Sequence, residues 1–413
     1  MGFQTGLSGL NAASQNLDVI GNNVANASVV GFKSSRTLFA DVYAASLNGA
    51  GANAIGIGTK VADIQQQFTQ GNITVTNNPL DIAINGGGFF RMSDNGTITY
   101  SRNGQFHFNE DGYIVNADNL RLSGYGVDAS GNIVASAPVA IQLDTADIAP
   151  KVTSDFGVGL NLDARATPPT TAVFNPADPT SFTASTSGTV YDSLGNSHVF
   201  TQYFVKTATN GQWNLHGAVD GTALANVNLG AGAGNPVVLN FNSSGALTTA
   251  MPIAAASLTV AGGAATPLTF ALDFQGSTQY GSNFSVNSLT QDGYTSGRLS
   301  GFSIAGDGQI LGQYSNGQSK TLGQVVLANF ANPEGLTPLG NNQWQESADS
   351  GLPLIGAPAT GNLGALQSAA VEDSNVDLTA ELVNMITAQR VYQANAQSIK
   401  TQDQVLQTLV NLR

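Results

Sequence analysis

The sequence predicts a mainly β protein with helical ends, and three observations lead to that fold class. Apolar residues near both termini recur at alternating spacings of three and four, the pattern of paired helices. Between the ends, short runs rich in β-branched and aromatic residues are separated by turn dipeptides. Residues 150–289 are richer in Ala, Thr, Pro and Gly. We therefore expect N- and C-terminal helices that pair as a coiled-coil-like inner domain, followed by a β-domain with a second β-domain inserted in it.

Both terminal helices are predicted from one apolar seam each. In the first helix, Ser14 and Gly21 complete the alternation of the large seam positions Phe3, Leu7, Leu10, Leu17 and Val24. In the second helix the large seam positions are Leu378, Leu382, Met385, Tyr392, Ile399, Leu406 and Val410. These two sets form the predicted assembly interface.

The start and length of the second helix can also be predicted. The segment SNVD at 374–377 resembles a capping box, in which the Ser374 hydroxyl accepts from the third helical N–H. With no Gly or Pro inside, the helix can run to about Leu409, a length on the order of 50 Å.

The central segments read as antiparallel β-structure. The dipeptides Asp111–Gly112, Asp220–Gly221, Asp292–Gly293 and Asp307–Gly308 are typical of tight turns. We expect four parts: a terminal helical polymerisation domain (1–28 plus 371–413), a connecting segment (29–76), a central β-domain (77–149 plus 290–370) and an inserted outer β-domain (150–289).

The charge content limits the possible partners. Charged residues make up 10% of the chain and the net charge is −13, without a Lys/Arg cluster, so we expect no nucleic-acid partner. The chain has no cysteine, which excludes disulfides and thiolate chemistry. The N-terminus lacks a cleavable-leader pattern and no apolar run reaches the roughly 18 residues of a membrane span. We expect no membrane span, and export, if it occurs, by a route without a cleaved leader.

Candidate chemical groups have simpler structural explanations. His107, His198 and His216 lie in separate predicted strands without metal-ligand spacing. The Asp–Gly carboxylates are explained by turn geometry, and the glycine-rich stretches at 85–90 and 230–234 do not join a strand to a helix. We therefore expect neither catalysis nor a cofactor nor a metal site.

The terminal helices are unusually poor in charge. The first carries Asp18 alone, and the outer faces of both are rich in Asn, Gln, Ser, Thr and Ala. A two-helix hairpin packed on a single domain is the simpler alternative, but such a hairpin normally solvates its outer face with Lys and Glu. Uncharged outer faces favour burial against neighbouring copies, so the hypothesis is that the termini drive polymerisation.

The terminal sequences resemble a known family. NLDVIGNNVANASVVGFKSSR (16–36) and the segment from 374 to 413 are similar to the ends of bacterial flagellar axial proteins, the rod and hook proteins. Internal stretches such as GIGTKVADIQQQFTQG, NPLDIAINGGGFF, YSRNGQF and LGQVVLANFANPEGL extend the resemblance over nearly the whole chain. The residues that carry the N-terminal motif are Asn16, Asp18, Gly21, Asn22, Asn23, Asn26, Gly31, Phe32 and Lys33.

The resemblance implies a function as well as a fold. Because rod relatives are shorter and lack the inserted domain, it favours the hook members, whose subunits assemble into a curved, flexible, hollow tube that passes motor torque to the filament. It implies helical self-assembly outside the cell and contacts with the distal rod protein, the hook cap, the hook-junction protein and the flagellar export apparatus. The alternatives are a distal rod or hook-junction protein and, from another class, a secreted β-rich adhesin. An enzyme ranks third, because the sequence shows no convergent polar constellation.

Overall fold

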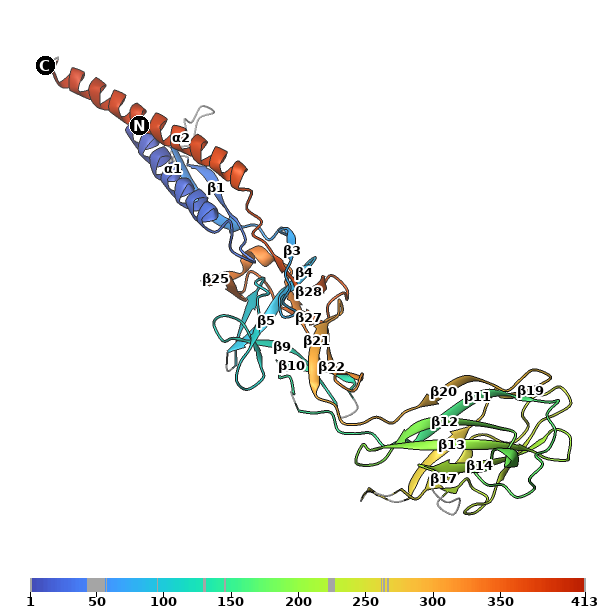
Figure 1. Cartoon of the computed structure of the whole chain (residues 1–413). Coiled ribbons are helices and arrows are strands. Elements are labelled where there is room, and N and C mark those ends of the chain that lie inside the picture. Colours follow the sequence, from blue (N-terminus) through green and yellow to red (C-terminus); the bar gives the residue numbers. More distant parts are fainter. Residues whose placement is uncertain are drawn as a thin grey trace. The chain divides into compact units, whose positions relative to one another are not determined.

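The computed structural model describes residues 2–42, 56, 58–94, 96–128, 131–144, 146–221, 227–260, 262, 264–265 and 267–411, without the side chains of residues 2, 254, 255 and 409–411. The chain forms two compact units (Figure 1). Unit 1 comprises Met1–Thr145, Gly301–Gln313 and Ser319–Arg413, and unit 2 comprises Ala146–Ser300 and Tyr314–Gln318. Unit 1 thus holds both terminal helices together with a β-region. Unit 2 begins four residues before the predicted start of the insert, ends eleven residues after its predicted end, and also includes Tyr314–Gln318.

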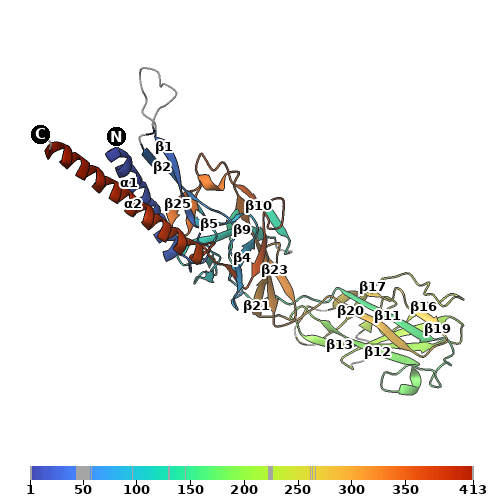
Figure 2. The ribbon, with the colours of Figure 1, turned by 90° about the horizontal axis from the view of Figure 1, so that it is seen from above.

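Helices α1 (Gly2–Ala25) and α2 (Leu378–Asn411) lie side by side in both ribbon views (Figures 1 and 2). Strands β1 (Ser35–Val42) and β2 (Gly58–Gln66) form an antiparallel hairpin that packs along α1. The hairpin lies within the predicted connecting segment. The expected pairing of the two terminal helices is confirmed.

The start of α2 differs from the capping box predicted from the sequence. The Asp377 carboxylate accepts the backbone N–H groups of Thr379 and Ala380, at 2.9 and 3.1 Å, and is therefore the N-cap. The Ser374 hydroxyl instead accepts from the N–H of Val376, in the turn before the helix. The prediction of Ser374 as the cap was wrong because Asp377, an equally good capping residue, lies three positions further along.

The β-region of unit 1 is built on a 13-stranded sheet. Its main path runs β21 (Leu299–Ile304), β22 (Gln309–Tyr314), β23 (Ser319–Val325), β9 (Arg121–Val127), β5 (Phe89–Asp94), β6 (Thr97–Ser101), β26 (Gln343–Gln345), β25 (Thr337–Gly340). Paired off this path are β7 (His107–Phe108), β8 (Ile114–Val115), β10 (Ile133–Ala140), β24 (Leu327–Asn329) and β27 (Leu354–Gly356). Two small antiparallel pairs join early and late strands: β4 (Ile82–Asn85) with β28 (Ala365–Ser368), and β3 (Ile73–Val75) with β29 (Ala370–Glu372).

Two apolar clusters stabilise this β-region. One is mainly aliphatic and includes Ile82, Ile84 and Met92, all fully buried. The other is aromatic and packs Phe89 and Trp344 edge to face. Burial does not alternate strictly along these strands: three consecutive residues of β4, Ile82–Ile84, are buried, whereas buried side chains alternate with less buried ones in β22.

Unit 2 consists of two sheets that share one core. The six-stranded sheet holds β11 (Asp155–Asp163), β15 (Val227–Asn228), β17 (Ile253–Leu258), β18 (Leu268–Asp273), β19 (Thr278–Tyr280) and β20 (Ser285–Gln291). The four-stranded sheet holds β12 (Ala184–Tyr191), β13 (Ser197–Lys206), β14 (Gln212–Val219) and β16 (Val237–Asn240). Phe156 of the first sheet and Phe200 of the second meet edge to face in this core. Short 3-10 turns complete the described elements at Pro179–Ser181 in unit 2 and Pro333–Gly335 in unit 1.

The chain enters and leaves unit 2 through two adjacent segments. Ile148 bridges Gly297 and Lys151 bridges Tyr294, both antiparallel. Close to these bridges, the Asp292 carboxylate accepts the N–H groups of Ser154 and Asp155 at 2.8 and 2.9 Å. Asp292 therefore holds the start of β11, and its assignment to a tight turn was wrong.

The three other Asp–Gly dipeptides lie in turns that use the left-handed backbone region. Gly112, Gly221 and Gly308 have φ values of 81°, 67° and 84°. At Gly112 and Gly308 the turn joins two strands that pair with each other, β7 with β8 and β21 with β22, whereas β14 before Gly221 pairs with β13 and β16.

Candidate functional site

The helix pair of unit 1 is antiparallel and closely packed. A Cβ atom added to Gly6 would lie 3.0 Å from Cγ1 of Ile399, and one added to Gly9 would lie 2.8 Å from Oδ1 of Asn395. Near the other end of the pair, the Asn23 side-chain amide donates to Glu381 Oε1 at 3.3 Å. Glycine thus permits the close approach of the helices, which offsets its unfavourable helix propensity.

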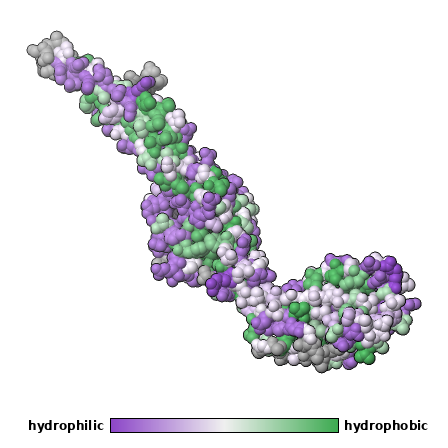
Figure 3. Space-filling view, viewed as in Figure 1, coloured by the Kyte–Doolittle hydropathy of each residue, from purple (hydrophilic) through white to green (hydrophobic). Residues whose placement is uncertain are grey.

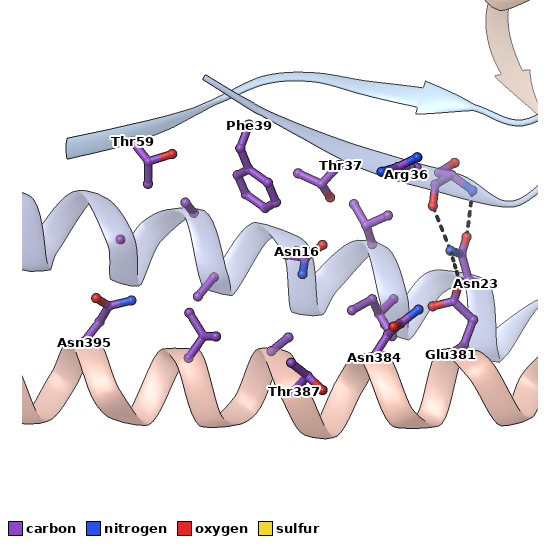
Figure 4. A pocket seen from close by; sticks show the side chains of 18 of the residues that line it. Asn16, Asn23, Arg36, Thr37, Phe39, Thr59, Glu381, Asn384, Thr387 and Asn395 are labelled. Atoms are coloured by element: carbon purple, nitrogen blue, oxygen red, sulfur yellow. Dashed lines mark hydrogen bonds between the residues drawn. The ribbon is translucent and has the colours of Figure 1, made fainter. Parts of the chain in front are cut away.

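A groove of about 900 Å³ is lined by residues of α1, of α2 and of the β1–β2 hairpin. Figure 4 shows α1 between the hairpin and α2, with Asn16, Thr37, Phe39, Thr387 and Asn395 among the side chains that line the space. Most of the lining is small or uncharged, and its two charged residues are Arg36 and Glu381. We call this space the helix groove.

On α1, the residues whose contacts set the register with α2 are Gly6, Gly9 and Asn23, and none of them is a large seam residue. The face of α1 that is buried in the chain consists of the smaller residues Gly6, Ala12, Ala13, Val19, Ile20 and Asn23. Of the α2 seam, Ile399 contacts Gly6 and is half-buried. The large seam residues of α1 lie on a different side of the helix.

Half of the twelve predicted seam residues are exposed. Six of them have exposures between 37% and 56%: Phe3, Leu7, Leu378, Leu382, Tyr392 and Leu406. Leu10, Leu17, Val24, Met385 and Ile399 are half-buried. The side chain of Val410 lies outside the described part of the chain.

Further apolar residues of α2, absent from the predicted seam, are exposed as well. They are Val383, Ile386, Val391 and Val405. Figure 3 shows apolar residues gathered on the surface of the helical part of unit 1. Exposed apolar surface of this extent on paired helices is typical of a protein–protein contact.

The N-terminal motif residues connect the bases of both helices to the β-region. Asn23 exchanges two hydrogen bonds with the backbone of Ser35, at 2.8 and 2.9 Å. The Ser34 N–H donates to Asn375 Oδ1, just before α2. Gly31 has a φ of +72°, and a Cβ atom there would lie 2.6 Å from the backbone nitrogen of Asn103. We call this group of contacts the root cluster.

A buried charge group forms the centre of the root cluster. Lys33 Nζ lies 2.7 Å from Glu372 Oε1, and Arg102 Nη1 lies 3.1 Å from Glu372 Oε2. All three side chains are at most 4% exposed. Burial lowers the pKa of Lys33, and the charge of Arg102 adds to that effect, while Glu372 opposes it. Three segments that are distant in the sequence are therefore held together by charged side chains that are almost fully buried.

The other motif residues have smaller roles. Asn16 lines the helix groove, and the backbone carbonyl of Asn22 accepts from the side chain of Asn26 at the end of α1. Asp18 is exposed, Phe32 is half-buried, and a Cβ atom at Gly21 would meet no described atom within 4 Å. The sequence motif thus marks the root cluster more than the helix surface.

Glu372 and Arg102 were missed as site residues. Both are rare charges in a chain with 10% charged residues; Glu372 ends β29, and Arg102 directly follows β6. That combination was the available signal, because a charge in such a position has to be paired when it is buried.

The histidines of unit 2 have structural surroundings. His198 lies between Asp220, with Nδ1 to Oδ2 at 2.7 Å, and Asp192, with Nε2 to Oδ2 at 3.2 Å. His216 stacks on Phe174 with ring centroids 4.1 Å apart. Among the described residues, no group of three or more His, Asp or Glu side chains has the geometry of a metal site. Neither described helix has the combination of length and apolar character that a membrane crossing needs.

Comparison with protein families gives matches along the chain. The matching families are "Flagella basal body rod protein" at residues 3–33, "Flagellar hook protein FlgE/F/G D1 domain" at 83–192, "Flagellar basal body protein FlaE D2 domain" at 161–294 and "Flagellar basal body rod FlgEFG protein C-terminal" at 367–412.

Similar proteins extend over the full length of the chain. Flagellar hook protein FlgE of Escherichia coli (strain K12) is 44% identical and covers 100% of both chains. FlgE of Borreliella burgdorferi is 33% identical, over 99% of this chain and 98% of the relative. The crystal structure of Helicobacter pylori flagellar hook protein FlgE2, at 14% identity, matches with a TM-score of 0.51 over 73% of this chain and 99% of that chain, which supports the fold.

Proposed function

Because this chain belongs to the family of flagellar hook proteins, we propose that it is the structural subunit of a bacterial flagellar hook. In this proposal many copies associate through their terminal helices into a curved, flexible, hollow tube. The tube acts as a universal joint that passes motor torque to the filament. The role is structural and not enzymatic.

The exposed apolar residues on the paired helices are the observation that carries the proposal. Leu382 and Ile386 are 45% and 52% exposed in a single chain. Burying one such side chain stabilises a contact by roughly 1.5–3 kcal/mol, and the gain recurs in every copy. Helix α1 has no Lys, so burying its exposed side against another copy does not require the removal of a lysine charge from water.

The place and partners of the subunit follow from the same proposal. The hook lies outside the cell, so the chain leaves through the flagellar export apparatus without a cleaved leader. At its ends the tube contacts the distal rod protein and the hook-junction protein, and the hook cap covers the growing end. The match of residues 161–294 to the D2 domain favours a hook subunit over a distal rod protein.

Assembly of the purified chain in high salt, viewed by electron microscopy, tests the proposal. We expect curved, hollow tubes from the natural chain and from Leu382→Met, and none from Leu382→Asp. In a Trp213→Phe background, Trp344 fluorescence during urea unfolding should show that Leu382→Asp leaves the β-region of unit 1 folded. Straight, rigid tubes would favour the distal rod, and tubes from Leu382→Asp would contradict assembly through the helices.

A further inference from the structure

The helix groove contains a buried polar atom without a partner. Thr37 is 7% exposed, it lines the groove, and its hydroxyl has no hydrogen-bond partner among the described residues. Figure 4 places Thr37 on the hairpin side of the groove, facing the helices. A buried hydroxyl without a partner costs free energy, so its position indicates that a further polar group enters the groove.

Among the described residues, no other element lies beside the C-terminal end of α2 in either ribbon view. The contacts of Gly6 with Ile399 and of Gly9 with Asn395 fix the antiparallel register, and α1 therefore begins opposite Gln402. In Figures 1 and 2 the end of α2 extends past the start of α1. Val405 and Leu406 in this end are 55% and 56% exposed. We call residues 403–411 the α2 extension.

We propose that the helix groove binds the α2 extension of a second copy of this chain. The inference rests on the proposed function, because only a homopolymer supplies this occupant at high local concentration. The sizes agree: nine helical residues are about 13 Å long and, at a diameter of about 10 Å, fill roughly 1,000 Å³. The groove has a volume of about 900 Å³.

The chemistry of the two surfaces also agrees. The groove offers Ala12, Ala13, Val19 and Ala388 to the exposed Val405 and Leu406 of the extension. The neutral amide of Gln404 supplies the partner that the Thr37 hydroxyl lacks, while the amide of Gln407 donates to Asp403 Oδ2 at 2.9 Å within the same helix. Small residues in the groove let a helix backbone approach closely, as the glycines of α1 do for α2 within one chain.

The charges assign a direction to the contact. Arg36 lines the groove near the start of β1, and it makes no ion pair within the described residues. Asp403 is the acidic residue at the start of the extension. When two copies are stacked in the same orientation along the helix axis, Asp403 of one copy reaches the Arg36 end of the next groove. Such a contact is head to tail, and it generates an open helical filament.

Cysteine cross-linking in the full chain tests this contact, because the natural sequence has no cysteine. One chain carries Asn16→Cys in the groove and a second carries Gln404→Cys in the extension. The control replaces Asn16→Cys by Asn11→Cys, the same residue type on the exposed side of α1. Equal amounts are mixed, oxidised with copper phenanthroline, and analysed for linked peptides by mass spectrometry.

A disulfide requires Cβ atoms within about 3.5–4.5 Å, so we expect the 16–404 link to exceed the 11–404 link by about tenfold or more. Arg36→Asp should reduce the 16–404 link, and Asp403→Arg in the second chain should restore it. Equal or lower yield at position 16 would overturn the proposal, whether or not tubes form. If neither charge change alters the yield of the 16–404 link, the proposed direction of the contact is wrong. If tubes form without the 16–404 link, the groove contact is wrong and the proposed function stands. If the link forms without tubes, the groove contact stands and the proposed function is wrong.

Discussion

Lys33 and Glu372 are separated by 339 positions in the chain, yet their side chains form a 2.7 Å ion pair with 0% and 1% exposure. The pair joins the segment that follows α1 to the strand that precedes α2. Arg102 brings the central sheet into the same group. Both helices therefore share one attachment to the β-region of unit 1, and the stability of that attachment depends on very few side chains.

Removing either member of this pair should destabilise unit 1 strongly. Breaking a buried pair costs about 3–5 kcal/mol because the remaining charge stays buried. Glu372→Gln should cost more than Lys33→Met, since it leaves two buried cations, whereas Glu372 keeps Arg102 when Lys33 is lost. Urea unfolding followed by Trp344 fluorescence in a Trp213→Phe background measures this, because the two tryptophans lie in different units.

The exposed Lys60 offers a control for this comparison. Lys60→Met should change the unfolding midpoint of unit 1 little, as is usual for surface charges. Equal midpoints for Lys33→Met and Lys60→Met would show that the buried pair contributes nothing to stability.

Two glycines of the N-terminal motif should respond to alanine with opposite signs. Gly31→Ala forces a side chain into the left-handed region at φ +72° and against the backbone of Asn103, so we expect a loss of about 1–2 kcal/mol or more. Gly21 lies inside α1 with no described atom within 4 Å of an added Cβ, so Gly21→Ala should stabilise the helix by about 0.5–1 kcal/mol. Urea midpoints for Gly31→Ala and amide exchange in α1 for Gly21→Ala provide the measurements.

His216 should make unit 2 less stable in acid. Burial lowers the pKa of His216 from 6.5 to about 4. The unfolded chain therefore binds a proton between these pH values that the folded chain does not, and stability falls by up to about 3 kcal/mol as the pH is lowered through this window. His216→Phe should flatten this acid limb in Trp213-monitored unfolding. An unchanged acid limb in that variant would assign it to other groups.

His198 should act in the opposite direction. Burial alone lowers the pKa of His198, but its hydrogen bonds to Asp220 and Asp192 outweigh burial and raise it. Its contribution to stability is then fully present below pH 6.5 and is lost as the pH rises through the raised pKa. NMR titration of the imidazole signals should place the midpoint of His198 above that of His216, and the reverse order would contradict the assignment.

Amide hydrogen exchange in the unassembled chain should show a gradient along α2. Near residue 381 the helix is tied to α1 and is close to the root cluster, whereas the α2 extension contacts no segment of its own chain in the described structure. Isolated helices shorter than about 12–15 residues are marginal in water. Residues 403–411 should therefore exchange fastest and residues 381–388 slowest, and all of α2 should be protected in tubes. Uniform protection in the monomer would contradict this expectation.

The helices were predictable from the sequence, but the sides that they bury were not. The seam was chosen from large apolar residues such as Leu7 and Leu382, which a lone helix pair would bury. In the structure α1 is enclosed by α2 and the hairpin at once, so its buried side consists of residues small enough to be approached closely, such as Gly9 and Ala12. Small residues such as these have low hydrophobicity, so a search for large apolar residues does not select them. The periodicity of the large apolar residues therefore identifies the side of the helix that stays exposed in a single chain.

The root cluster was only half predictable for a different reason. Lys33 was identified through the N-terminal motif, but its partner Glu372 lies 339 positions away. Pairing at this separation depends on how β3 meets β29 and on how the chain turns at Gly31, and no local pattern contains that information. Glycine is the residue type that suits the left-handed turn at position 31. The atom that a larger side chain would meet there, however, belongs to Asn103, which lies in another segment of the chain.

The two bridges at the entrance of unit 2, Ile148 with Gly297 and Lys151 with Tyr294, make this unit replaceable. The chain departs and returns at neighbouring points, as it does at any tolerant site of domain insertion. A foreign domain whose own termini are adjacent can be spliced between these segments without altering the spacing of the flanking strands. In a repeating assembly, such a graft would display its cargo once per copy, at a density fixed by the lattice.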